Sequence, residues 1–237
     1  MCIRDSSSTY PSDVDHVLQL ELIEKEVVSC RACPRLVAWR EKVAKEKRAA
    51  YKDQEYWGLP VPGFGDPKAR ILIVGLAPGA HGANRTGRVF TGDRSGDFLY
   101  AALYRSGLAN QPESVDLGDG LKLKNVFITS PVKCVPPANK PNQKEQSRCR
   151  PFFEREISAL INVKVVVALG QIGYTSAAVE FGLSPKPKFS HGLEIEIDEN
   201  KKLLCSYHVS QQNTFTGRLT ESMFDSVIKR AKIIAGD

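Results

Sequence analysis

Four short apolar runs, each followed by a stretch with helical periodicity, constrain the fold of this chain more than any other feature. They are ILIVG, NVFITS, VKVVVALG and KLLCSYH, at residues 71–75, 125–130, 163–170 and 202–208. Continuous runs rich in Val and Ile are typical of strands that are covered on both faces. Helices are expected at residues 95–106, 143–161, 171–181 and 221–235. This alternation predicts an α/β protein with a mostly parallel sheet in three α/β/α layers.

The remaining segments are organised around those runs. Residues 1–13 are Ser-rich and aperiodic, which predicts a disordered tail. Helices are expected over residues 14–28 and 36–50, and the second of these is strongly charged, as a solvated helix would be. The chain has 237 residues, 42% of them hydrophobic, which is enough to bury a core. Residues 14–237 are therefore expected to form a single domain.

The charge balance favours an acidic partner. Lys and Arg number 33 against 27 Asp and Glu, which gives a net charge of +6. Such a balance favours polyanions without proving that one binds. No apolar run approaches the ~20 residues that span a bilayer, and the beginning of the chain does not resemble a secretory signal. A soluble, cytoplasmic protein is expected.

Four cysteines form a separate pattern. Cys30 and Cys33 share the segment SCRACP, and Cys134 and Cys149 flank a segment rich in Pro and Lys. Two thiolates at C-x-x-C spacing bind a metal from a single turn, and a second pair completes the site from a loop. Two disulfides are the alternative, but disulfides are rare in reducing compartments. The pattern favours one metal centre, and spacing alone leaves both zinc and an iron–sulfur cluster open.

Polar segments directly follow three of the predicted strands. They are LAPGAHGANRTGRVFTGDRSGDF, PVKCVPPANKP and HVSQQNTFTGRLT, which begin at residues 76, 131 and 208. The carboxyl ends of parallel strands meet at one edge of a sheet, where ligands bind. Glycines in the first segment let backbone N–H groups approach a ligand, and its arginines suit phosphate. This segment matches neither the dinucleotide-binding nor the P-loop fingerprint, so nucleotide binding of those kinds is disfavoured.

These three segments, taken with the four cysteines, resemble the uracil-DNA glycosylase superfamily, and specifically its family 5, the type B iron–sulfur enzymes. The resemblance covers about residues 28–235. It implies a parallel four-stranded sheet between helices and one four-iron four-sulfur cluster, with zinc as the less favoured metal. The implied cluster ligands are Cys30, Cys33, Cys134 and Cys149.

The resemblance also implies roles for residues at the strand ends. The segment at residues 75–79, with Ala77 and Gly79, would form the floor of the base pocket, and Phe90 would stack on an extruded uracil. His208 and Asn213 would reach the base and its sugar-phosphate. Ser130 stands where family 4 relatives place an Asn that reads uracil. A looser pocket is therefore expected, one that also accepts bases such as hypoxanthine or hydroxymethyluracil.

Many relatives carry a carboxylate in the first motif, but this chain has the apolar residues Leu76 and Ala77 there. The expected mechanism therefore relies on stabilising the departing base, with His208 donating to a uracil carbonyl and Asn84 positioning water. Catalysis is assigned to His208, Asn84 and Asn213.

The expected function is a monomeric, monofunctional DNA-repair glycosylase that flips uracil out of double-stranded DNA and leaves an abasic site. It would be cytoplasmic, and nucleoid-associated when on DNA. A non-catalytic iron–sulfur DNA-binding protein is the first alternative, and a zinc-stapled phosphate-ester or nucleotide-binding protein is the second. Basic side chains expected to clamp the phosphates are Arg85, Arg88, Lys133, Lys140 and Arg218.

Overall fold

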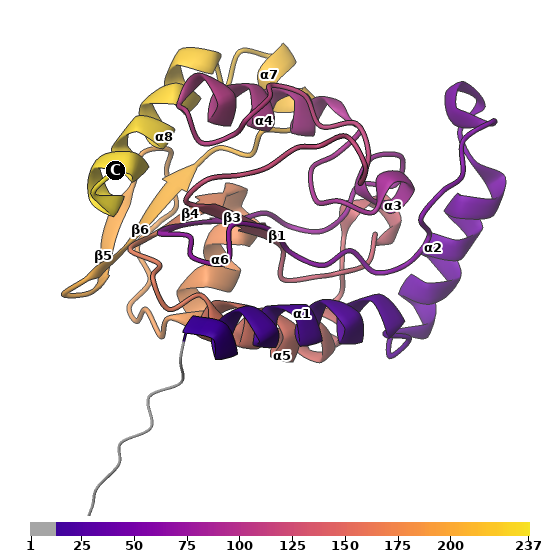
Figure 1. Cartoon of the computed structure of the whole chain (residues 1–237), viewed down its shortest axis with the longest axis horizontal. Coiled ribbons are helices and arrows are strands. Elements are labelled where there is room, and N and C mark those ends of the chain that lie inside the picture. Colours follow the sequence, from indigo (N-terminus) through magenta and orange to yellow (C-terminus); the bar gives the residue numbers. More distant parts are fainter. Residues whose placement is uncertain (1–12) are drawn as a thin grey trace, which may run out of the picture.

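The chain is built around one six-stranded sheet, as the computed structural model of residues 13–237 shows (Figure 1). The strand order is β1-β3-β2-β4-β6-β5. The strands are β1 (Phe64–Gly65), β2 (Ile71–Val74), β3 (Val126–Thr129), β4 (Val165–Leu169), β5 (Glu194–Asp198) and β6 (Lys201–Ser206). β3, β2, β4 and β6 run parallel, so their carboxyl ends share one edge. These four strands are the four apolar runs, which confirms the predicted α/β class.

The predicted number of four strands is wrong, because an antiparallel strand is added at each edge of the sheet. β1 pairs with β3, and β5 pairs with β6. β1 is two residues long and lies in a segment rich in Gly and Pro, so it has no periodic signal. β5 has the sequence EIEID and alternates apolar with charged side chains. Such alternation is typical of a strand with one covered face, whereas the prediction relied on continuous apolar runs.

Helices cover both faces of the sheet, which gives the three predicted layers (Figure 1). α4 (Arg94–Arg105) and α8 (Glu221–Ala235) pack on one face, and α5 (Gln143–Ala159) and α6 (Gly170–Glu180) pack on the other. α1 (Asp13–Ser29) lies along α5. The remaining helical elements are α2 (Pro34–Glu46), α3 (Ala83–Thr86), α7 (Gln211–Phe215) and two short 3-10 turns, η1 (Ala49–Tyr51) and η2 (Pro137–Asn139).

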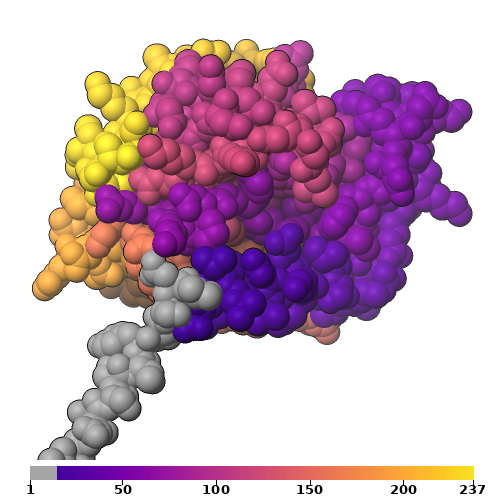
Figure 2. Space-filling model, in the orientation of Figure 1, coloured from indigo at the N-terminus to yellow at the C-terminus, as the bar shows by residue number. Residues whose placement is uncertain are grey.

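α4 and α8 are far apart in the chain but lie side by side at the surface, where magenta meets yellow in Figure 2. Arg105 of α4 and Asp225 of α8 form an ion pair there, with 2.7 Å between nitrogen and oxygen. Both side chains are partly exposed, so the pair adds little stability by itself. Their apolar faces hold the two helices against the sheet.

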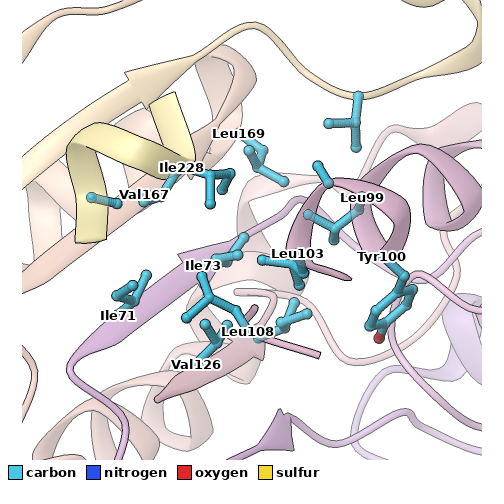
Figure 3. Close-up of a cluster of buried hydrophobic side chains, with 14 of the residues drawn as sticks. Ile71, Ile73, Leu99, Tyr100, Leu103, Leu108, Val126, Val167, Leu169 and Ile228 are labelled. Carbon is cyan, nitrogen blue, oxygen red and sulfur yellow. The ribbon is translucent and has the colours of Figure 1, made fainter. Parts of the chain in front are cut away.

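Two apolar clusters fill the space between the sheet and its helices. Successive residues of β2 point to opposite faces, so Ile71 and Ile73 pack toward α4 and α8. Leu72 and Val74 pack toward α5 and α6. Figure 3 shows the first cluster, where side chains from β2, β3, β4, α4 and α8 meet. Burial on both faces explains why these strands appear as unbroken apolar runs.

The predicted disordered tail, residues 1–13, lies outside the described residues except for Asp13, which begins α1. The helix predicted over residues 14–28 is α1 itself. None of the helices in residues 13–237 is long and apolar enough to cross a membrane.

Lys133 belongs to a buried ion pair, which corrects the prediction that it contacts DNA phosphates. Its ammonium donates to Thr129 Oγ1 and to Glu156 Oε2, each at 2.6 Å. The other carboxylate oxygen, Glu156 Oε1, accepts the N–H of Gly63 at 3.2 Å. The network joins β3, α5 and the segment before β1 inside the protein. A buried charge needs such a partner, since desolvation is costly.

Arg88 is a second buried cation, and its predicted DNA contact is wrong for the same reason. Its Nη1 donates to both Asp119 carboxylate oxygens at 2.9 Å and to Ser114 Oγ at 3.1 Å. The guanidinium also lies over the Phe64 ring, 4.6 Å from its centroid. Arg88 thus ties the glycine-rich segment to the loop between α4 and β3.

Removing the Lys133 ammonium is expected to lower the melting temperature markedly. Lys133→Met leaves the Glu156 carboxylate buried without its cation, a change that costs about 3–5 kcal/mol in such pairs. For a chain of this size the melting temperature should fall by roughly 10 °C. The double variant Lys133→Met/Glu156→Gln removes both charges, so it should recover part of that loss. Melting is measured by circular dichroism. If the double variant melts no higher than Lys133→Met, this role of the ion pair is contradicted.

Candidate active site and cysteine site

A cavity of about 340 Å³ lies at the carboxyl edge of the sheet, where the segments after β2, β3 and β6 meet. The structure brings together in its lining all four residues predicted for the base pocket, Ala77, Gly79, Phe90 and Ser130. His208 lines it as well. The volume lies at the lower end of the range for small-molecule pockets and suits one ring-sized group.

Phe90 turns its ring toward this cavity because its backbone has a left-handed conformation, with φ of 52°. A side chain at Gly75 would come within 2.8 Å of the Phe90 ring, and one at Gly96 would overlap the Phe90 carbonyl oxygen. Both positions therefore require glycine. The Phe90 and His208 ring centroids are 6.1 Å apart. An aromatic face and an imidazole thus border the same space.

His208 follows β6 and is positioned by its own loop. Asn213 donates its side-chain amide to the His208 carbonyl oxygen at 2.8 Å, and it is not among the residues that line the cavity. Asn213 therefore fixes the backbone of His208 from outside the cavity. This placement does not fit its predicted contact with the base. Burial lowers the pKa of His208 to about 4, so the imidazole is neutral at pH 7. A neutral imidazole carries one ring N–H that it can donate.

Asp93 is a functional candidate that the sequence analysis missed. It lines the cavity, so the expectation of a site without a carboxylate is wrong. Asp93 Oδ1 caps α4 by accepting the N–H groups of Ser95 and Gly96 at 3.0 and 3.2 Å. Burial raises the pKa of Asp93, although those two N–H groups oppose the shift. The only signal in the sequence is an aspartate before a helix, which reads as an ordinary cap.

Asn84 does not lie where water would reach a bound base. Its side chain is buried in α3 and is absent from the cavity lining. The amide donates to the carbonyl oxygen of Arg40 at 3.3 Å, and Arg40 does not line the cavity either. The predicted role in positioning water therefore does not fit the structure, and Asn84 instead joins the glycine-rich segment to α2.

A wider groove of about 660 Å³ continues from the cavity and shares Gly79, Asp93 and Ser210 with it. The exposed side chains of Arg48 and Arg94 line this groove. The sequence analysis singled out neither, because both lie in charged stretches that resemble solvated surface. The groove is wide and basic enough to receive a phosphate backbone.

The other side chains predicted to contact DNA differ in their exposure to solvent and in their hydrogen bonds within the protein. Lys140 and Arg218 are exposed. Arg85 is only partly exposed, and its guanidinium donates to the carbonyl oxygens of His81 and Gly92 at 2.8 and 2.7 Å. Arg85 thus holds the glycine-rich segment in shape. On α7, Phe215 is 67% exposed, the largest exposed fraction among the large hydrophobic residues that the structure describes as exposed.

The four predicted metal ligands line a common cavity. Cys30 follows α1, Cys33 precedes α2, Cys134 lies after β3 and Cys149 lies in α5. All four are free thiols, so no disulfide joins them. Burial raises the pKa of Cys134, and that of Cys149 to about 12.

Two hydrogen-bond donors contact these thiols. Arg40 donates to Cys134 Sγ at 3.1 Å, and the backbone N–H of Lys133 donates to Cys149 Sγ at 3.2 Å. Within residues 13–237, no three His, Cys, Asp or Glu side chains are grouped so as to hold one metal ion. The four thiols line one cavity in this arrangement, and a four-thiol donor set is one that both zinc and an iron–sulfur cluster accept.

Comparison with known proteins gives a consistent result. Residues 62–232 match the model of the uracil DNA glycosylase superfamily. The type-5 uracil-DNA glycosylase of Mycobacterium tuberculosis is 54% identical over 210 residues, which cover 87% of this chain and 78% of that protein. The type-5 enzyme of Thermus thermophilus is 52% identical over 218 residues, which cover 91% and 98%. That of Pyrobaculum aerophilum is 43% identical over 210 residues, which cover 89% and 91%.

The matched residues include the strand ends, the cavity and the segment from Cys134 to Cys149. On these grounds the chain belongs to the uracil-DNA glycosylase superfamily, and within it to the type-5 family.

Proposed function

We propose that this protein is a DNA-repair enzyme that removes uracil from double-stranded DNA by hydrolysing the bond between base and deoxyribose. The observation that carries the proposal is one ring-sized cavity bordered by Phe90, a neutral His208 and the carboxylate of Asp93. Relatives at 43–54% identity that are named uracil-DNA glycosylases support the same reaction. The product is an abasic site, the starting point of base excision repair.

The departing base is the first group that needs stabilisation. As the glycosidic bond breaks, its electron pair moves to the uracil nitrogen, and negative charge spreads to the uracil carbonyl oxygens. The neutral His208 N–H donates to one of these oxygens, and backbone N–H groups of the segment at residues 75–79 are close to the same space. A donor aimed at developing charge typically contributes a factor of ~10²–10³ to the rate.

The attacking water needs a proton acceptor, and Asp93 is placed to supply it. One carboxylate oxygen, Oδ1, is held by the α4 N–H groups, and the other, Oδ2, lies beside Gly79 and Gly82 of the glycine-rich segment, where Asp93 lines the cavity. Water adds its oxygen to the sugar carbon, and its proton passes to Asp93. The raised pKa of Asp93 makes this carboxylate a stronger proton acceptor than an ordinary aspartate. The negative charge of Asp93 also favours the positive charge that develops on the sugar.

The base reaches the cavity only after it leaves the helix. Flipping costs a few kcal/mol and is easiest for a mismatched pair such as uracil opposite guanine. Arg48 and Arg94 in the groove, with the exposed Lys140 and Arg218, fit the phosphates that flank the flipped nucleotide. Phe215 is an exposed apolar side chain on α7, whose Gln211 and Gln212 line the groove. It suits the gap that the flipped base leaves. With DNA as its substrate, the protein is proposed to work in the cytoplasm, on the nucleoid when bound.

We also propose that the cysteine site holds a four-iron four-sulfur cluster, through Cys30, Cys33, Cys134 and Cys149. The donor set of four thiols supports it, and so does their arrangement around one cavity, because each thiolate of a cluster binds a different iron. A bound cluster would cross-link α1, α2 and α5 and would supply a one-electron redox couple. It would also fix the loop from Cys134 to Cys149, whose Asn139 lines both cavity and groove.

The alternative of a non-catalytic DNA-binding protein is not favoured. It was suggested by the apolar residues Leu76 and Ala77, and Asp93 supplies the carboxylate that they lack.

Ser130 lines the cavity with a small side chain, whose hydroxyl donates to the Val132 carbonyl oxygen at 3.0 Å. The small size of this side chain supports the proposal that the cavity accepts other damaged bases besides uracil.

His208→Ala is expected to lower the single-turnover rate on a duplex with one U·G pair by ~10²–10³, because the donor to the departing base is lost. The assay measures strand scission after alkali treatment. His16→Ala is the matched control, because His16 lies in α1 and does not line the cavity, and the rate of this variant should stay near that of the unaltered protein. Equal rates for both variants would overturn the assignment. The same duplex with hypoxanthine tests the base range, and strict uracil specificity would end that part of the proposal.

Asp93→Asn should lower the rate by ~10²–10⁴ while the melting temperature changes little. Asparagine keeps the cap on α4, so the variant removes the proton acceptor alone. In the unaltered protein the rate should fall as pH falls through the pKa of Asp93, at a pH above the ordinary range of aspartates. The acidic limb of the pH–rate profile should be absent in Asp93→Asn. A variant with a full rate and an unchanged profile would exclude Asp93 as the acceptor.

Protein purified without oxygen is expected to contain iron and acid-labile sulfide in equal amounts, and no stoichiometric zinc. Cys134→Ala should lose the iron, because one ligand is missing. Cys205→Ala is the matched control, since Cys205 is buried in β6 away from the cysteine site, and it should keep its iron. Metal analysis that found zinc in place of iron would refute the cluster.

A further inference from the structure

Three cations are buried in the part of the chain that the structure describes, and they differ in how their charge is balanced. Lys133 pairs with Glu156, and Arg88 pairs with Asp119. Arg40 is fully buried in α2, and it has no carboxylate partner among the ion pairs of residues 13–237. A buried guanidinium without an anion is costly, so the charge of Arg40 requires an explanation.

The contacts of Arg40 point to the cysteine site. Its Nη1 donates to the Cys30 carbonyl oxygen at 3.2 Å and to Cys134 Sγ at 3.1 Å. Its Nε and Nη2 are buried and have no hydrogen-bond partner. Two of its three guanidinium nitrogens are therefore unpaired. Arg40 itself lines a different cavity, whose lining includes the exposed Glu21 and Glu24, and it reaches the cysteine site through its hydrogen bond to Cys134 Sγ. An anion held by the four thiols would meet the positive charge of Arg40 through that contact.

Arg40 is held in place independently of any such anion. It lies in the middle of α2, which begins directly after Cys33. Its carbonyl oxygen accepts the Asn84 amide at 3.3 Å, and the Asn84 N–H donates to the Gly79 carbonyl oxygen at 3.0 Å. α2 is thus fastened to the glycine-rich segment on its other side. The guanidinium is a fixed buried charge and has little freedom to turn toward solvent.

We infer that Arg40 is the counter-cation of the cysteine site, a positioning residue that retains the proposed cluster by its charge and raises the reduction potential of that cluster. This inference rests on the proposed cluster. Four thiolates outweigh the positive charge of an iron–sulfur core, so the assembly is an anion and balances the guanidinium. Reduction adds one electron and makes the anion more negative. A nearby cation in a poorly polar site therefore stabilises the reduced form, and the hydrogen bond to Cys134 Sγ acts in the same direction.

The test compares the cluster in four full-length proteins purified without oxygen: unaltered, Arg40→Met, Arg40→Lys and Arg148→Met. Arg148 is the control for a solvent-screened charge, since it lines the cysteine cavity beside Cys33 but is exposed to solvent, donating to the Ala32 carbonyl oxygen at 3.1 Å. Each protein is titrated with dithionite, which supplies the electron, and reduction is followed by electron paramagnetic resonance. Release of iron to a chelator is measured in parallel.

Arg40→Met is expected to shift the potential to more negative values, by clearly more than Arg148→Met. Arg40→Lys keeps the charge and loses the planar fork, so its potential should lie between those of Arg40→Met and the unaltered protein. Iron release from Arg40→Met should be about tenfold faster or more, because a hydrogen bond to a charged group is lost.

An Arg40→Met potential equal to that of the unaltered protein, or shifted no further than in Arg148→Met, would overturn the inference while leaving the cluster in place. If Arg40→Met cannot be obtained with iron, Arg40→Lys decides the matter. Retained iron in Arg40→Lys supports a role for the charge, and loss of iron there refutes it. Absence of iron from the unaltered protein would refute the cluster itself, so the two failures are distinguishable.

Discussion

Both sites of this protein depend on the buried ion pair between Lys133 and Glu156. Lys133 lies between Ser130, which lines the base cavity, and Cys134, which lines the cysteine site. Its ammonium is fixed by β3 and α5, and its backbone N–H reaches Cys149 Sγ. The buried Lys133 side chain therefore fixes the chain between the edge of the sheet and Cys134, in a segment that lines both the base cavity and the cysteine site. Only three residues separate Ser130 from Cys134, so a displacement of one of these residues is transmitted to the other.

Burial has opposite effects on the two ionisable groups of the base cavity, and both effects serve the proposed reaction. It lowers the pKa of His208, which keeps the imidazole neutral, and it raises the pKa of Asp93. In each case the poorly polar surroundings disfavour the charged form. The same cavity thus provides an uncharged hydrogen-bond donor for the departing base and a basic carboxylate for water. Neither group needs a special partner to acquire these properties.

Sequence patterns predicted the parts of the fold that follow a repeating physical rule. The four central strands and six long helices were found because they are continuous apolar runs or helical stripes, whereas β1 and β5 lack such runs. His208 was predicted because it follows a strand end, whereas the roles of Phe90 and Ser130 came from the resemblance to the family. The errors arose where a residue type does not reveal the direction of its side chain. Arg88 and Lys133 are basic but point inward, Asn84 is polar but buried, and Asp93 resembles a simple cap. Arg40 lies in a helix whose charged sequence resembles solvated surface, although its guanidinium is buried.

Because Gly75 and Gly96 fix the position of Phe90, the residues that line the base cavity differ in how freely they can be substituted. Any larger residue at either position would displace Phe90, since one glycine leaves room for its ring and the other for its carbonyl oxygen. Ala77 and Ser130 carry no such restriction from Phe90. Mutational drift, or a designed library, can therefore reshape the opening that faces the edge of a base, while the aromatic platform beneath the base stays where it is. New base preferences in this scaffold would have to arise from that one side.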